Sequence, residues 1–311
     1  MFIKHFNQLS KDDVLIAGGK GASLGEMVRA NIPVPPGFVV LASAFDKFLE
    51  ETDLDVEIEA LLHGVNHQDI NSVEKVSAQI RDLISKAAFP KDIAEDITSA
   101  FSKLKAESVA VRSSATAEDS TVASWAGELE SYLNTTKDVL LENVKKCWAS
   151  LFTPRAIFYR FEKQLHTAKI SVAVVIQTMI QSEVAGVCFT VHPVTKDYDQ
   201  MVIEAGYGLG EAIVGGKITP DTYVLNKRDW KILDKNISQQ KVMILKGNNG
   251  NIEKEVSKSK QDKQKLEDNK IMQLAQLCQK IEMHYSHPQD IEWAFEKGKF
   301  YILQSRPITT L

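Results

Sequence analysis

The sequence predicts an α+β protein, with helices dominating the first half and mainly antiparallel sheet in the second. Apolar residues recur at helical spacing up to about residue 165, whereas short runs rich in β-branched and aromatic residues follow one another from about residue 172. Successive short strands of this kind favour antiparallel pairing. Changes in character along the chain predict three subdomains, at 1–105, 106–195 and 196–311.

The composition is typical of a globular protein. With 311 residues, 44% hydrophobic and 25% charged, the chain can bury one large core or two smaller ones. The net charge of -4 argues against broad affinity for nucleic acid or membranes. Neither a membrane span nor the apolar core of a signal peptide is visible, so we expect a cytoplasmic protein. The three cysteines, Cys147, Cys188 and Cys278, form no CxxC pair and are expected to be buried thiols.

The first half is expected to alternate helices with short strands. Prolines between Pro33 and Pro36 stop a helix at about 22–30, and Ser43 is placed to cap a helix at 43–50. Residues 53–75 fit either a surface connection or a ragged helical insert. Pro90 suits a helix start, where a missing N–H has no cost. The other expected elements of this half are the strand at 37–41, the helices at 73–87 and 91–105, the strand at 109–111, and the helices at 138–151 and 154–165.

The second half is expected to contain strands, one long helix and a closing hairpin. A lysine-rich stretch with few apolar residues, 253–265, predicts a solvated linker or mobile loop. The expected strands are 172–179, 186–191, 201–204, 222–225 and 230–233, followed by a helix at 266–284 and the hairpin strands 290–295 and 299–304.

A glycine segment, 18–21, opens the first expected helix and contains Lys20. Bare backbone N–H groups, the positive end of a helix and an ammonium group together favour phosphate binding. The alternative is a glycine turn with a solvent-exposed lysine. The segment is not a Walker A loop, because Gly21 stands where that loop needs Ser or Thr.

Arg112 ends an apolar strand beside two serines and precedes a long polar loop that runs to about Gly127. Its planar guanidinium is suited to gripping phosphate oxygens. The alternative is an ion pair with Glu118 or Asp119.

Asp290 and Glu292 alternate along one expected strand, and Gln304 and Arg306 alternate along the next. A carboxylate, an amide oxygen and nucleotide phosphates make an oxygen-only site suited to magnesium. Arg306 could neutralise a phosphate on the same face. The alternative is an ordinary Glu–Arg pair across an exposed sheet.

A glycine-rich segment and the histidines are two further groups of residues that could carry chemistry. The segment from Gly206 to Gly216 is rich in glycine and contains Glu211, and it predicts either a binding segment or a hairpin connection. The seven histidines form no i, i+4 pair and no triad signature, which excludes metal-hydrolase and serine-hydrolase readings.

Taken together and in this order, the motifs resemble the N-terminal nucleotide-binding domain of the phosphoenolpyruvate synthase, pyruvate phosphate dikinase and rifampicin phosphotransferase family. The resemblance covers nearly the whole chain. It rests on residues 14–27 (VLIAGGKGASLGEM), 33–38 (PVPPGF), 110–119 (AVRSSATAED), 147–152 (CWASLF), 208–212 (GLGEA), and 289–293 (QDIEW) with 304–307 (QSRP).

The resemblance implies an ATP-grasp fold in which two subdomains close on ATP and Mg²⁺. It implies that the residues divide into four roles. These are Lys20 and Arg112 for the triphosphate, Gly127 and Ser131 for the loop over the phosphates, Gln177 to Met179 for the strand edge that reads adenine, and Glu292 and Gln304 for magnesium. Arg306 and Asp290 would lie beside the metal and phosphates, and Glu211 is a further nucleotide-binding candidate.

The chain departs from the family pattern in two ways. Glu128 stands where the family often has glutamine, which adds a negative charge near the phosphate loop, and Ser131 stands where it has threonine. The histidine motif of the swivelling domain in full-length relatives is missing from these residues, as is the acceptor domain. The expected function is therefore transfer of a phosphoryl or pyrophosphoryl group from Mg-ATP to a histidine on a separate domain. The alternatives are a stand-alone nucleotide-binding module without turnover and the ATP domain of an antibiotic-modifying enzyme like rifampicin phosphotransferase.

Overall fold

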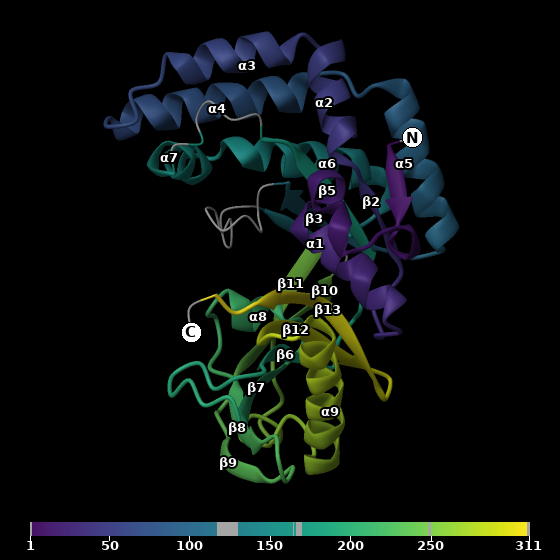
Figure 1. Cartoon of the computed structure of the whole chain (residues 1–311), viewed down its shortest axis with the longest axis vertical. Helices are drawn as coiled ribbons and strands as arrows, with labels where there is room; N and C mark the ends of the chain where they lie inside the picture. The colour runs from purple at the N-terminus through teal and green to yellow at the C-terminus, as the bar shows by residue number, and fades with distance from the viewer. Residues whose placement is uncertain (1, 117–129, 164, 166–169, 248–249, 310–311) are drawn as a thin grey trace. The chain divides into compact units, whose positions relative to one another are not determined.

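The computed structural model describes residues 2–116, 130–163, 165, 170–247 and 250–309 (Figure 1). The chain divides into two compact units. The first unit comprises Met1–Glu26 and Pro36–Met179, and the second comprises Met27–Pro35 and Ile180–Leu311. The expected mixture of helices and antiparallel sheet is confirmed. The division into three subdomains is finer than these two units and stays a prediction.

The first unit is built on a five-stranded sheet in the order β1-β2-β5-β3-β4. Every described pairing in it is antiparallel. Its strand β5 lies in the interior of the sheet, between β2 and β3. The strands are β1 (Ile3–His5), β2 (Gly37–Val40), β3 (Val109–Ala115), β4 (Ser131–Thr135) and β5 (Val172–Thr178).

Helices bury one face of this sheet. Alternate residues of the strands, among them Phe38, Val111 and Ile176, join the aromatic side chains Phe48 and Trp148 in one hydrophobic core. The contributing helices are α2 (Ala42–Glu51), α3 (Leu54–His63), α4 (Ile70–Lys86), α5 (Lys91–Leu104), α6 (Leu140–Ala149) and α7 (Pro154–Glu162). Short 3₁₀ turns lie at η1 (Phe6–Gln8), η2 (Lys11–Asp13), η3 (Lys137–Val139) and η4 (Ser150–Phe152).

Two expectations for this region are resolved by the structure. Residues 53–75 are helical over most of their length, because Leu54 and Ile58 give α3 a buried side that holds it to the core. Ser43 does not cap α2. The helix begins at Ala42, its N-cap is Leu41, and no side chain makes a capping hydrogen bond there.

Helix α1 (Val14–Arg29) begins earlier than the expected residue 22 and has a break at Gly18, where φ is 67°. Around Gly21 the helix packs on β2, since a Cβ on Gly21 would lie 3.0 Å from Val39 Cγ2. Val39 alternates with the core residues Phe38 and Val40, so it lies on the other face of the sheet. The glycine segment therefore lies on the face of the sheet that points away from the helical core.

The second unit is built on a six-stranded antiparallel sheet in the order β13-β12-β6-β7-β8-β9. Helix α9 (Asp268–Tyr285) covers one face, where the Cys278 thiol interacts with Cys188 of β6. The three cysteines are free and buried, as expected. The strands are β6 (Val184–Phe189), β7 (Gln200–Tyr207), β8 (Asp221–Asn226), β9 (Ile232–Asn236), β12 (Gln289–Glu296) and β13 (Lys299–Pro307), with the short helix α8 (Glu211–Val214) between β7 and β8.

Most residues of the predicted solvated stretch, 253–265, are exposed as expected, but the stretch is not a linker. Its first residues belong to a hairpin of β10 (Val242–Gly247) and β11 (Gly250–Glu255). At its end the ammonium of Lys265 lies 2.8 Å from Asp221 Oδ1, and both side chains are fully buried. The Asp221 carboxylate also accepts hydrogen bonds from Tyr223 Oη at 2.7 Å and from the Ser238 N–H at 3.0 Å. This buried ion pair fastens the segment to β8.

None of the helices in the described ranges is long and apolar enough to span a membrane.

Candidate functional site

The glycine segment of α1 packs closely on strand β3. A Cβ on Gly18 would lie 2.1 Å from Ser114 Oγ and 2.4 Å from the Ser114 carbonyl oxygen, so only glycine fits. The combination of φ 67° and ψ 169° is likewise a conformation for glycine. Lys20 follows two residues later and is half-buried. The predicted phosphate-binding turn therefore lies against the strand that carries Arg112.

Strand register brings further predicted residues to the same face. Arg112 of β3 is directly opposite Ser131 of β4 and Val175 of β5. Gln177 of β5 is opposite Ala110, two residues from Arg112. Residues that oppose each other or alternate along a strand share a face, so Arg112, Ser131 and Gln177 lie on the face away from the helical core. Three predicted residues that are distant in sequence thus meet on one surface of the first unit.

Part of the predicted phosphate loop lies outside the described residues. Gly127 and Glu128 belong to this part, as do Glu118 and Asp119, the alternative ion-pair partners of Arg112. Those predictions stay untested. Ser131, at the start of β4, is described and exposed.

Two buried polar atoms on this face make no hydrogen bond within the described part of the chain. They are Ser114 Oγ and Gln177 Nε2. Buried polar groups are nearly always paired, and an unpaired one destabilises the protein by about 1–3 kcal/mol. A ligand rich in hydrogen-bonding atoms, such as a nucleotide, fits this arrangement because it could satisfy such groups.

Two backbone N–H groups at the end of β5 already donate hydrogen bonds within the protein. The Thr178 N–H donates to the Pro36 carbonyl at 2.8 Å, and the Met179 N–H donates to the Ser108 carbonyl at 3.1 Å. Because β5 is an interior strand, adenine cannot be read along its side by N–H groups. We therefore expect Gln177 and Met179 to contact adenine through carbonyl oxygens and side chains at the end of β5.

In the second unit, the predicted metal ligands are directly opposite each other. Glu292 of β12 pairs in register with Gln304 of β13, and Asp290 pairs with Arg306. Neither the Glu292 carboxylate nor the Gln304 amide makes a hydrogen bond within the described residues, so both are available to a ligand. Arg306 instead binds Asp290, through Nε at 2.8 Å and Nη2 at 2.7 Å. The alternative of a Glu292–Arg306 pair is therefore not what the structure shows.

A third carboxylate, Glu204 of β7, shares the face of this site. Val187 of β6 is opposite both Glu292 and Glu204, so all three lie in one row across the sheet. Burial raises the pKa of Glu204, and the charge of Asp290 adds to the effect. Burial also raises the pKa of Asp290, although Arg306 opposes that shift. The face therefore carries an excess of partly buried negative charge, which favours a cation.

Magnesium fits these side chains only with help from a ligand. The described residues contain no group of three or more His, Cys, Asp or Glu side chains that could hold a metal by themselves. Mg²⁺ is usually bound by one or two carboxylates together with phosphates and water, and an amide oxygen is an acceptable hard donor. Glu292 and Gln304 are therefore suitable donors for a Mg-nucleotide.

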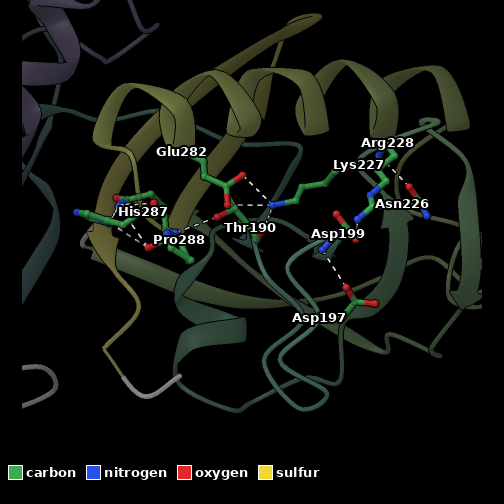
Figure 2. A network of polar contacts seen from close by, with 10 residues as sticks. Thr190, Asp197, Asp199, Asn226, Lys227, Arg228, Glu282, His287 and Pro288 are labelled. Atoms are coloured by element: carbon green, nitrogen blue, oxygen red, sulfur yellow. Dashed lines mark hydrogen bonds and ion pairs between the residues drawn. The ribbon is translucent and has the colours of Figure 1, made fainter.

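A polar network on the opposite face supports the two site-bearing strands. Gln289 precedes Asp290, and its Oε1 accepts a hydrogen bond from Ser305 Oγ at 2.7 Å. The Gln289 N–H donates to Thr190 Oγ1 at 2.9 Å. Figure 2 shows Lys227 extending the network, because its Nζ donates to the Thr190 carbonyl at 2.7 Å and to both oxygens of Glu282 at 2.9 Å. This network ties β6, β12 and β13 together directly behind Asp290 and Arg306.

The glycine-rich connection between β7 and β8 contains a short helix rather than a simple hairpin turn. Gly208 has φ 84°, and a Cβ there would lie 2.5 Å from the Ile244 carbonyl oxygen. Glu211 starts α8, and its Oε2 accepts a hydrogen bond from Asn251 Nδ2 at 2.6 Å. The structure thus joins Glu211 to the β10–β11 hairpin and does not join it to the Glu292 row.

Sequence reasoning missed Glu204 as a member of the site. Glu204 lies in the run Val202–Tyr207, between apolar residues that face α9. This alternation of apolar and polar residues was the only signal in the sequence that Glu204 points away from α9. Its closeness to Asp290 depends on a strand order that the sequence does not show.

Comparison with known proteins identifies the family to which the chain belongs. The family described as the pyruvate phosphate dikinase AMP/ATP-binding domain matches residues 14–311. The chain therefore belongs to this family, and it is an ATP-binding domain.

Its relatives are longer proteins. The chain is 47% identical over 318 residues to a probable phosphoenolpyruvate synthase of Methanocaldococcus jannaschii, covering 100% of the chain and 27% of the relative. A probable phosphoenolpyruvate synthase of Methanothermobacter thermautotrophicus is 45% identical over 318 residues, with 100% and 46% coverage. The rifampicin phosphotransferase of Bacillus subtilis is 37% identical over 309 residues, with 98% and 36% coverage. The chain thus spans less than half the length of each of these relatives.

Proposed function

We propose that this chain binds Mg-ATP in an ATP-grasp fold and donates a phosphoryl or pyrophosphoryl group to a histidine on a separate domain. Lys20, Arg112 and Ser131 are assigned to the triphosphate. The loop containing Gly127 is assigned to the same task, and the end of β5, at Gln177 and Met179, to adenine. Asp290, Arg306 and Glu211 are assigned supporting contacts to the nucleotide.

Glu292 and Gln304 are the proposed magnesium ligands. When bound, Mg²⁺ would neutralise phosphate charge. The protein's own contribution is to hold phosphate oxygens in place and to offset their charge, since phosphoryl transfer needs little covalent chemistry from the protein. Arg306 is suited to this role, because it is a cation on the same face as Glu292 and already lies against the Asp290 carboxylate.

The observation that carries the proposal is the register pair of Glu292 and Gln304. Both side chains are left without protein hydrogen bonds in the described residues, beside a carboxylate that Arg306 already binds. A structural ion-pair array would be expected to use these groups on one another. A carboxylate and an amide that face each other without protein hydrogen bonds are better explained as groups that bind a ligand.

The proposal has two alternatives for the final acceptor of the phosphoryl group. The relatives named phosphoenolpyruvate synthase favour a dikinase that acts on pyruvate, and the relative named rifampicin phosphotransferase favours an antibiotic-modifying enzyme. A histidine-bearing domain and an acceptor domain are proposed partners in either case. A cytoplasmic location is part of the proposal and rests on composition alone.

Transfer in trans tests the proposal. The chain is incubated with Mg-ATP and with a separately produced histidine-bearing domain from a phosphoenolpyruvate synthase. We expect slow release of AMP by the chain alone, because water is a poor substitute for the acceptor, and faster release with the added domain. Phosphate label on that domain should be acid-labile and base-stable, as phosphohistidine is. Rapid release of AMP by the chain alone, or label on the chain itself, would show a self-sufficient ATP hydrolase or autokinase instead.

A further inference from the structure

One row of side chains crosses the sheet of the second unit on the face that carries the proposed magnesium ligands. Directly opposed residues of neighbouring strands share a face, so strand register defines the row. From β13 to β9 its members are Gln304, Glu292, Val187, Glu204, Thr222 and Asn236. All of these residues are described, and only Glu292 and Glu204 among them are charged. The row therefore contains two carboxylates and no cation.

Glu204 of β7 is the charged member of this row that has no assigned role. It is half-buried, and its carboxylate makes no hydrogen bond or ion pair with the residues that the structure describes. Adjacent strands lie about 4.7–4.9 Å apart, and only β6 separates β7 from β12. The charge of Glu204 is thus within electrostatic range of a ligand held by Glu292, although Val187 lies between the two glutamates.

The neighbouring row on the same face adds further negative charge. It contains Asp290, which is paired with Arg306, and it ends at Asp234 on the edge strand β9. The two rows together hold four carboxylates and one guanidinium. Burial, and then the charge of Asp290, raise the pKa of Glu204, so its negative charge is unfavourable where it lies.

The charge of this face acts differently on the two forms of ATP. Without a metal, ATP is a polyanion, and its phosphates are repelled by carboxylates that have no cationic partner. With magnesium, part of the phosphate charge is neutralised, and the same carboxylates attract the cation. A group that repels the wrong ligand contributes to specificity even where it adds no attractive contact. The charge of Glu204 therefore penalises metal-free ATP more than it penalises Mg-ATP.

We propose that Glu204 is a specificity-determining residue that makes ATP binding depend on magnesium, because its charge repels ATP without a metal and tolerates Mg-ATP. The inference rests on the proposed function, in which the phosphates of ATP and the magnesium ion face Glu292 and Gln304. Glu204 acts through its charge, whereas Glu292 and Gln304 are the proposed contacts to the metal.

Calorimetric titration of Glu204→Gln with ATP in EDTA measures the repulsion. At low ionic strength, where screening is weakest, the variant should bind metal-free ATP about threefold or more tightly than the wild type, and its affinity for Mg-ATP should change by less than about twofold. Glu204→Asp retains the charge and should bind metal-free ATP about as weakly as the wild type. Glu267→Gln, at an exposed glutamate that precedes α9 on the opposite face, should change neither affinity.

A series of ligands separates repulsion from a change in structure. Repulsion grows with the charge of the ligand, so the gain of Glu204→Gln in EDTA should be smaller for ADP than for ATP and absent for adenosine. Equal changes for ATP and adenosine would show a structural role for Glu204. Unchanged affinity for metal-free ATP in the variant, or weaker binding of Mg-ATP alone, would also overturn the inference, and the second result would make Glu204 a metal ligand. Failure of the proposed function is distinguishable, because the wild type itself would then bind ATP equally well with and without magnesium.

Discussion

The Asp290 carboxylate accepts a hydrogen bond from Arg306 Nε at 2.8 Å across β12 and β13, and Arg306 Nη2 lies 2.7 Å from the same oxygen in an ion pair. Glu292 and Glu204, on the same face, have no ion-pair partner among the residues that the structure describes. Without a bound cation, repulsion between these partly buried carboxylates lowers the stability of the folded chain.

The first prediction concerns Glu204→Gln in metal-free buffer. Burial and Asp290 raise the pKa of Glu204 in the folded chain, so the folded state binds its proton more tightly than the unfolded state does. Stability is therefore lost as pH rises from the ordinary glutamate pKa, about 4.3, through the raised value. The variant should melt at a higher temperature than the wild type at neutral pH and should have no such advantage in acid below that window. A variant less stable than the wild type at neutral pH would contradict this reading of the charge.

The second prediction concerns Lys20→Ala and Arg112→Ala. Each should weaken binding of ATP by roughly 1.5–3 kcal/mol, the scale of one hydrogen bond to a charged group, and should affect adenosine much less. Calorimetry with both ligands measures the difference. Lys103→Ala, at an exposed lysine near the end of α5, is the matched control and should change neither affinity. Equal losses for ATP and adenosine would indicate a folding defect rather than a lost phosphate contact.

The third prediction concerns Gly18→Ala. The substitution places a Cβ 2.1 Å from Ser114 Oγ and demands a backbone conformation that costs non-glycine residues about 1–3 kcal/mol. We expect a lower free energy of unfolding and, in the fraction that folds, weaker ATP binding. Gly216→Ala separates the two causes, because Gly216 also has a positive φ, 65°, but nothing lies within 4 Å of its Cβ position. Similar losses for both variants in urea unfolding would mean that the close packing of Gly18 on Ser114 is unimportant.

The fourth prediction concerns the buried pair of Lys265 and Asp221. Lys265→Met leaves the Asp221 carboxylate buried without its ion-pair partner, and such a change typically costs about 3–5 kcal/mol. Lys260→Met, at an exposed lysine of the same stretch, should cost little. The double variant Lys265→Met with Asp221→Leu should lose less than the sum of the single variants, measured by urea unfolding. Strict additivity would show that the two side chains do not stabilise each other.

Much of the fold was predictable because its signals are local. Helices α4 to α7 have regular apolar spacing, and the hairpin of β12 and β13 has clear alternation, so both were placed within a few residues. The glycine segment and the Asp290–Glu292 alternation were predictable for the same reason. Each of these features is specified by residues within one turn or one strand.

What the sequence could not reveal depends on partners distant in the chain. Lys265 was assigned to a solvated stretch, and only its contact with Asp221, 44 residues earlier, explains its burial. The β10–β11 hairpin was missed because most of β11 is exposed and lacks an apolar face. Glu204 joins Asp290 and Glu292 only through the order of β7, β6 and β12 in the sheet.

Magnesium dependence of ATP binding is the most direct measurement of the central claim. Calorimetric titration of the chain with ATP should give at least about tenfold higher affinity with magnesium than with EDTA, and Glu292→Ala should largely remove this difference. Glu296→Ala, at another glutamate of β12, should retain it. If the wild-type chain binds ATP equally well with magnesium and with EDTA, Glu292 and Gln304 are not the metal ligands and the proposed site is wrong.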